Sequence, residues 1–174
     1  MSLHYDFHRA KRIIQSMSAG ESSHLKAVCD RIRHAEERLN AAAASAIEHC
    51  MLNCGGMCCR NIHLDQLIGV KDFVFLLTVE RHLKETMHAC LEKESIYSAD
   101  CLFLENGVGP CLFSSNAKPE MCICTFCSDA TAMKQEIEDV KAAFNVLARF
   151  LLLIKSRAWL QRLRAVFLSP AQPG

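Results

Sequence analysis

The sequence IEDVKAAFNVLARFLLLIKSRA, residues 137–158, decides the fold that we predict for this chain. Its apolar residues recur at alternating steps of three and four, which places them along one side of an α-helix. We expect this helix to run from about Ala130 to Phe167, with Ser128 or Asp129 as its N-cap. A helix with such an apolar seam packs against another helix, so the stretch predicts a helical bundle. The seam consists of Ile137, Val140, Phe144, Leu147, Leu151, Ile154 and Ala158.

Three further helices are predicted upstream, over Asp6–Ser18, Ser22–Asn53 and Leu64–Lys93. The second is rich in Ala, Glu, Arg and Leu and contains no Gly or Pro, and Gly55-Gly56 stops it. The third contains FVFLLTV, which alone would pass for a strand, but no helix breaker appears between positions 70 and 96. The chain has only seven Gly and four Pro, too few for the many turns of an all-β fold. We therefore predict an all-α fold, an antiparallel helical bundle.

Length and charge bound the organisation and the class of protein. A chain of 174 residues is predicted to form a single domain that buries roughly 70% of the surface its unfolded form exposes. Its net charge of +1 gives no field for holding nucleic acid. The N-terminus lacks a secretory h-region, and Asn145 and Arg149 interrupt the longest apolar stretch, so we expect a cytoplasmic protein without a transmembrane segment. Within residues 1–174, the predicted parts are N-terminal helices (1–53), cysteine-rich loops (54–63 and 97–127) and core helices (64–96 and 128–168).

The chain contains eleven cysteines, and nine of them fall in two clusters. Thiols in a reducing cytosol seldom form structural disulfides, so clusters of this kind indicate metal binding or redox chemistry. Buried cysteine can also serve as a small apolar residue, but clusters beside Gly and Pro lack a packed face to fill. Nine thiols suffice for one four-sulfur site with spares, or for two sites. The candidate ligands are Cys50, Cys54, Cys58, Cys59, Cys101, Cys111, Cys122, Cys124 and Cys127.

The spacing within each cluster suits a shared ion. Cys50 and Cys54 lie one helical turn apart, and the glycines after them let the chain fold back toward Cys58. In the second cluster, MCICTFC contains Cys124-x2-Cys127, the spacing with which two sulfurs clamp one metal. The loop at 97–127 holds three turn signals and needs something to fix its shape. A metal-binding, cysteine-rich cap on the bundle would provide this.

The pattern resembles the cysteine-rich zinc- or iron-chelating domain family, whose motif is of the CxxCxxCC type. The similarity covers about residues 50–127, with first spacings one residue longer than the family motif and Lys118 where the family has Arg. It implies a thiolate-ligated zinc or iron–sulfur centre. The residues that carry it are Cys50, Cys54, Cys58-Cys59, Cys101-Leu102-Phe103-Leu104, Gly109-Pro110-Cys111, Lys118-Pro119 and Cys122.

Between these metals we favour an iron–sulfur cluster over zinc, because thiols from separate segments have apolar neighbours such as Met57 and Ile123 that exclude water. Zinc would instead act as a structural clip between the two loops, and Cu(I) buffering is a third alternative. The leading hypothesis for the function is a protein, more an electron carrier, redox sensor or metal handler than an enzyme, whose metal centre performs that role. One alternative is a structural zinc protein whose bundle binds a protein partner. The seam at 137–158 would also serve a homodimer.

A metalloenzyme is the other alternative, and its signals are weaker. Glu21-x-x-His24 and Glu85-x-x-His88 have the spacing of di-iron bundle sites, with Glu48 and Glu136 as further ligands, but surface polar residues account for them better. The polar residues available to line a pocket beside the metal are Asp100, Glu105 and Asn106. His49 and His63 flank the first cluster and could replace a thiolate. His4 and His8 lie one helical turn apart, where we expect the terminus to fray.

Overall fold

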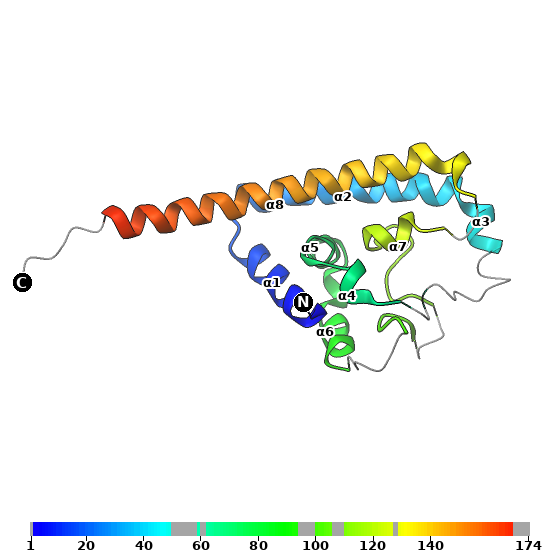
Figure 1. Cartoon of the computed structure of the whole chain (residues 1–174), viewed down its shortest axis with the longest axis horizontal. Coiled ribbons are helices and arrows are strands. Elements are labelled where there is room, and N and C mark those ends of the chain that lie inside the picture. The colour runs from blue at the N-terminus through cyan, green and yellow to red at the C-terminus, as the bar shows by residue number, and fades with distance from the viewer. Residues whose placement is uncertain are drawn as a thin grey trace, which may run out of the picture.

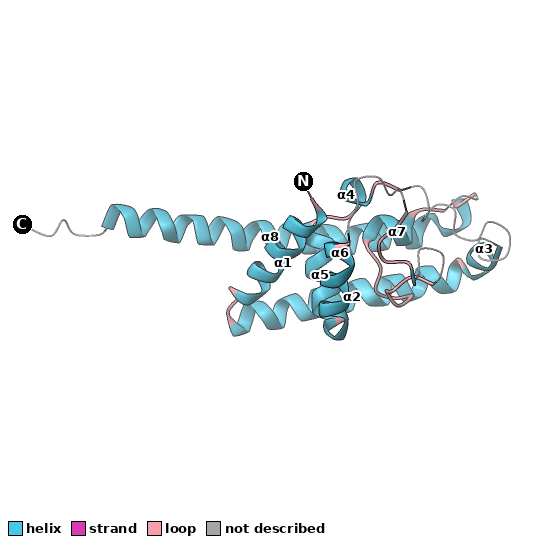
Figure 2. Cartoon of the chain, turned by 90° about the horizontal axis from the view of Figure 1, so that it is seen from below, coloured by secondary structure: helices cyan, strands magenta, loops and turns pink. Residues whose placement is uncertain are grey.

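The structure is a computed structural model that describes residues 2–49, 59, 62–93, 100–105, 110–126 and 129–168. At positions 48, 49, 158 and 161–168 it describes the helix but not the side chain. Within these ranges the chain is helical and has no β-strand, which confirms the all-α fold (Figure 2). A single isolated antiparallel bridge joins Leu104 and Cys111.

Two long antiparallel helices, α2 (Ala19–Ala42) and α8 (Lys134–Leu168), form one side of the molecule (Figure 1). Contacts along their length fix the register: Arg38 pairs with Asp139 at 3.1 Å near one end, and Arg157 lies 3.8 Å from Glu21 near the other. The prediction that the apolar seam packs against another helix is confirmed at the centre of the seam, where its residues are fully buried. The residues toward its ends are half-buried. The buried seam residues are Val140, Phe144 and Leu147, the half-buried ones are Ile137, Leu151 and Ile154, and the side chain of Ala158 lies outside the described residues.

The other side of the molecule is built around α5 (Val70–Val79), which packs against α1 (Leu3–Gln15), α2 and α8. Residues 73–77, FVFLL, are all buried. A helix that is enclosed on every side is apolar all round, which explains why this segment lacks helical periodicity. Aromatic rings join the two sides: Phe7 of α1 meets Phe73 with centroids 5.6 Å apart, and Phe75 meets Phe144 at 5.2 Å.

The single helix predicted over 64–93 is wrong, because the structure divides it. The elements are α4 (Leu64–Leu67), α5, a 3₁₀ turn η3 (Arg81–Leu83) and α6 (Lys84–Glu92). The first break arises because the Asp72 carboxylate accepts a hydrogen bond from the Gly69 N–H at 3.0 Å and so caps a new helix start. At the second break, the backbone of Glu80 leaves the helical region.

The predicted boundaries of the first helices also shift. Helix α1 begins three residues earlier than predicted, at Leu3, because the Ser2 side chain caps it. Helix α2 begins at Ala19, where Ser18 and Glu21 form a capping box. It ends at Ala42, and the short helix α3 (Ala44–His49) follows.

The C-terminal part of α8 projects beyond the start of α2 (Figure 1). Apolar side chains there are exposed, among them Leu152 and Trp159 at 64% and 60% exposure. Among the described residues, no helix combines the length and the apolar character needed to cross a membrane.

Candidate metal centre

Residues 100–105 and 110–113 lie side by side and set the positions of Cys101 and Cys111. The Leu112 N–H donates to the carbonyl of Phe103 at 2.7 Å, and the Glu105 N–H donates to the carbonyl of Pro110 at 3.0 Å. Phe103 and Phe113 are buried, with ring centroids 4.9 Å apart, and they anchor this pair of segments in the core. These hydrogen bonds and the two buried rings therefore set the backbone positions of the two cysteines.

The first cysteine cluster meets the second through Cys59. The Cys101 N–H donates to the carbonyl of Cys59 at 2.8 Å, which brings two segments 42 positions apart into direct contact. The sequence left open whether the two clusters form one site or two, and this backbone contact places Cys59 beside Cys101. The other predicted ligands of the first cluster, Cys50, Cys54 and Cys58, lie outside the described residues, as does Cys127.

Helix α7 (Glu120–Cys124) carries Cys122 and Cys124, and the turn before it is held by three buried acids. The Lys118 N–H donates to Glu36 at 3.1 Å, and the Glu120 N–H donates to Asp72 at 3.0 Å. The Ser114 hydroxyl donates to the third acid, Glu80. Carboxylates of α2 and α5 therefore fix the loop that the sequence assigned to a metal.

Polar side chains of α2 extend this anchoring. The Asn40 side chain donates to the carbonyl of Ser115 at 2.6 Å, and the Asn116 side chain donates to Glu37 at 2.8 Å. Sequence reasoning did not identify the buried acids Glu36 and Asp72. A signal existed for both: Glu36 lies four residues after Ile32 on the buried face of α2, and Asp72 directly precedes the apolar FVFLL segment.

The electrostatics of Cys122 show that several thiols share one neighbourhood. Loss of solvent around this thiol raises its pKa, and the thiols of Cys101, Cys111 and Cys59 raise it further. Such repulsion between like charges acts over short distances in a protein. Cys59, Cys101 and Cys111 are therefore near enough to Cys122 to act on its pKa.

Cys90 of α6 belongs to the same neighbourhood, although the sequence set it apart. Burial raises the pKa of Cys101 to about 11, and the thiols of Cys111 and Cys90 contribute to that rise. We define the thiol cluster as Cys59, Cys90, Cys101, Cys111 and Cys122.

Two other cysteines lie in different surroundings. Burial raises the pKa of Cys124 to about 11, and the charged groups that act on it are Glu120, Lys141, Glu36 and Lys71 rather than thiols. Cys29 is fully buried in the core on α2, as a small apolar residue would be.

The donor set fits a soft metal, but the described sulfurs are not at the distances of a closed zinc site. Thiolate is the preferred ligand of zinc, Cu(I) and iron–sulfur clusters. Around one tetrahedral zinc ion, sulfurs lie about 3.8 Å apart. Among the described cysteines, no three sulfur atoms all lie within 4.8 Å of one another.

Glu21, His24 and His63, which the sequence also offered as metal ligands, have other surroundings in the described part of the chain. The Glu21 carboxylate accepts from the Ser18 N–H at 2.9 Å, so it caps its own helix. His24 packs on Phe150, with ring centroids 4.8 Å apart. His63 is exposed, while the side chains of Glu48 and His49 are not described. The described residues among them agree with the interpretation as helix caps and surface polar groups rather than as ligands of a di-iron site.

No protein-family model matches this chain, and neither a curated protein nor a solved structure was found to match it. The resemblance to the chelating domain family therefore rests on the cysteine spacing in the sequence.

Proposed function

We propose that the cysteine-rich side of the molecule binds a thiolate-ligated metal centre, with Cys59, Cys101, Cys111 and Cys122 as ligands. The observation that carries this proposal is the meeting of these four thiols from three separate segments. A cluster of protonated thiols gains from a metal, because the cation removes the repulsion that opposes thiolate formation. Cys50, Cys54, Cys58 and Cys127 are the further candidate ligands.

An iron–sulfur cluster is the centre that we favour, with zinc as the alternative. A cluster of several iron and sulfide ions is larger than one zinc ion, so its thiolate ligands stand farther apart. Apolar residues beside it, including Phe103 and Phe113, would exclude water.

Electron transfer, redox sensing or metal handling are the roles that this position supports. Cys59, Cys101 and Cys111 are half-buried, and Cys122 is exposed as a residue although its thiol is largely removed from solvent. A centre at this depth can exchange electrons or metal with a partner without rearrangement of the core. In the sensing role, oxidation would release the metal and loosen the cysteine-rich segments.

Anaerobic purification followed by absorption spectroscopy and elemental analysis tests the proposal. We expect brown protein that absorbs near ~400 nm and contains iron and sulfide in similar amounts. Colourless protein with stoichiometric zinc would leave the thiolate centre in place but contradict the cluster. Protein without bound metal would contradict both.

Cysteine variants identify the ligands. Cys111→Ser should lower the metal content, whereas Cys29→Ala is the matched control and should retain it, since Cys29 is buried in the core outside the thiol cluster. Far-UV circular dichroism separates loss of metal from loss of fold. Equal metal content in the two folded variants would contradict the ligand assignment.

A further inference from the structure

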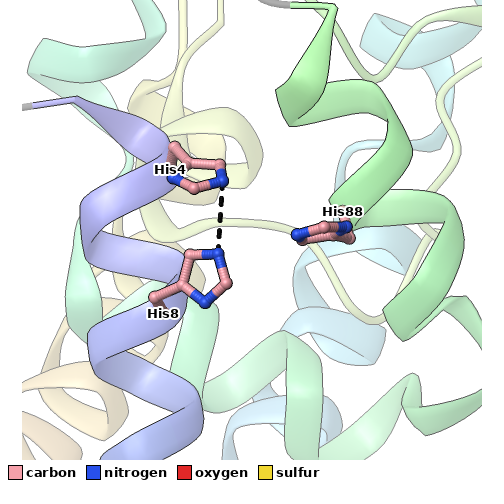
Figure 3. A group of neighbouring side chains, drawn as sticks. All are labelled: His4, His8 and His88. Carbon is pink, nitrogen blue, oxygen red and sulfur yellow. Dashed lines mark hydrogen bonds between the residues drawn. The ribbon is translucent and has the colours of Figure 1, made fainter.

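Three histidine side chains converge between α1 and α6. His4 and His8 lie one turn apart on α1, with their Nε2 atoms at 3.2 Å, and His88 comes from α6. One ring nitrogen from each of the three lies within 4.8 Å of the other two. Figure 3 shows the rings facing one another, with a nitrogen of His88 directed at the pair. Among the described residues, this is the only group of three or more His, Cys, Asp or Glu whose ligand atoms are so close.

The helix that carries His4 and His8 is anchored at its start, so the expectation that this terminus frays is wrong. The Ser2 side chain accepts a hydrogen bond from the Tyr5 N–H at 3.3 Å and caps the first turn. Leu3 and Phe7, the neighbours of the two histidines, are buried in the core. Since the i, i+4 spacing sets both histidines on one face, the packing of α1 holds them toward α6.

We propose that His4, His8 and His88 bind one divalent transition-metal ion, with Zn²⁺ as the ion that fits. Nitrogens bound to a tetrahedral zinc lie about 3.4 Å apart, close to the separation of His4 and His8. His88 would need to shift by no more than about 1.5 Å to complete a three-nitrogen site. The fourth position stays open to water or an exchangeable ligand, and the proposal is independent of the thiol centre.

A carboxylate lies beside the third imidazole, as is common for metal-binding histidines. Nδ1 of His88 lies 3.7 Å from a carboxylate oxygen of Glu92, which is longer than a hydrogen bond. Carboxylates that hydrogen-bond one ring nitrogen fix the tautomer of metal-binding histidines, and the Glu92 side chain would have to move about 0.5 Å closer to do so.

Titration of the full, untagged chain with Zn²⁺ tests the site while the thiol centre keeps its own metal. Calorimetry should show one more bound ion per chain than in the His88→Ala variant. In NMR spectra, the ring signals of three of the eight histidines should shift on addition of Zn²⁺. The NMR readout separates this site from zinc bound by thiols.

Matched variants make the test decisive. His82→Ala is the control, because its side chain is 74% exposed on η3 and lies outside the group. His4→Gln, at the edge of α1, is a second disrupting variant in case His88→Ala fails to fold. Glu92→Gln should weaken binding by about 10-fold or more if the carboxylate positions His88. Zinc binding that is equal in His82→Ala and in the folded triad variants would overturn the proposal.

Discussion

Glu36 is a buried carboxyl whose protonation couples the loop before α7 to pH. Its side chain is fully buried on α2, and one of its oxygens accepts from the Lys118 N–H, while the other has no hydrogen-bond partner among the described residues. Burial raises its pKa to about 8, although Lys118 and Arg33 act in the opposite direction, and the nearby Asp72 adds to the rise. The folded protein therefore holds this carboxyl protonated across a range where the unfolded chain does not.

The raised pKa predicts that Glu36 makes stability fall as pH rises. Above its ordinary value of 4.5 the unfolded chain releases the proton, and the folded protein keeps it up to about pH 8. The contribution of Glu36 to the free energy of unfolding is therefore greatest below about pH 4.5 and decreases between about pH 4.5 and pH 8. Above about pH 8 it no longer changes with pH. The decline amounts to roughly 5 kcal/mol. Denaturant unfolding of Glu36→Gln at a series of pH values should lack this decline.

The neighbouring Glu37→Gln is the control for that experiment. Glu37 is exposed and accepts from Asn116, so its replacement should leave the pH profile of the parent unchanged. Parallel profiles for the parent and Glu36→Gln would show that the carboxyl is ionised in the folded protein.

At the scale of single elements, the two faces of α8 should differ sharply in their contribution to stability. Leu147 is fully buried, whereas Leu152, five residues later on the same helix, is 64% exposed. Leu147→Ala should lower the free energy of unfolding by about 2–5 kcal/mol, because it leaves a cavity against the core. Leu152→Ala should change it by less than about 0.5 kcal/mol. Chemical denaturation measures both, and similar losses in the two variants would contradict the orientation of α8.

The start of α2 depends on the capping box at Ser18. The Ser18 hydroxyl accepts from the Glu21 N–H, and the Glu21 carboxylate accepts from the Ser18 N–H. Ser18→Ala should lower the free energy of unfolding by about 1 kcal/mol, because it leaves a helix-end donor unpaired. Ser22→Ala is the matched control inside the same helix and should have little effect. Thermal unfolding of the two variants measures the difference, and equal melting temperatures would argue against the cap.

The sequence predicts a helix well where an apolar repeat extends over several turns. It predicts helix boundaries poorly where contacts with other parts of the fold set them. The seam from Val140 to Leu147 revealed α8 because burial on one face leaves a repeating pattern. The breaks at Gly69 and Glu80 leave no such pattern, since carboxylate contacts and the packing of α5 set them. Four members of the thiol cluster are among the ligands that cysteine spacing predicts. The fifth, Cys90, could not be predicted, because its proximity to Cys101 depends on how α6 packs.

At the scale of the whole molecule, the fold and the proposed thiol centre are separable. The core formed by α1, α2, α5 and α8 is built mainly from buried aliphatic and aromatic residues, and Cys29 is the one fully buried cysteine among its described members. The histidine group between α1 and α6 escaped sequence reasoning for a related reason: His4 and His8 could be paired from their spacing, but only the tertiary arrangement brings His88 to them.

Removal of the metal should therefore loosen one region and leave the core folded. A metal bound by Cys59, Cys101, Cys111 and Cys122 closes long loops, so it stabilises their mutual arrangement. We expect a chelator to speed hydrogen exchange at the amides of Cys101 and Leu112, which bond only within the cysteine-rich segments. The amides of Lys118 and Glu120 should keep their protection, because Glu36 and Asp72 hold them to α2 and α5.

Hydrogen exchange followed by mass spectrometry, with and without chelator, distinguishes three outcomes. Exchange that rises only around residues 100–105 and 110–113 is the expected result, since local opening releases the segments that the metal joins. A chain that unfolds as a whole would show that the apolar core depends on the metal, contrary to the separation argued from its packing. Unchanged exchange everywhere would mean that the cysteines hold no metal. The carboxylate-held turn is the internal reference in each case, because its protection reports on α2 and α5 rather than on the thiols.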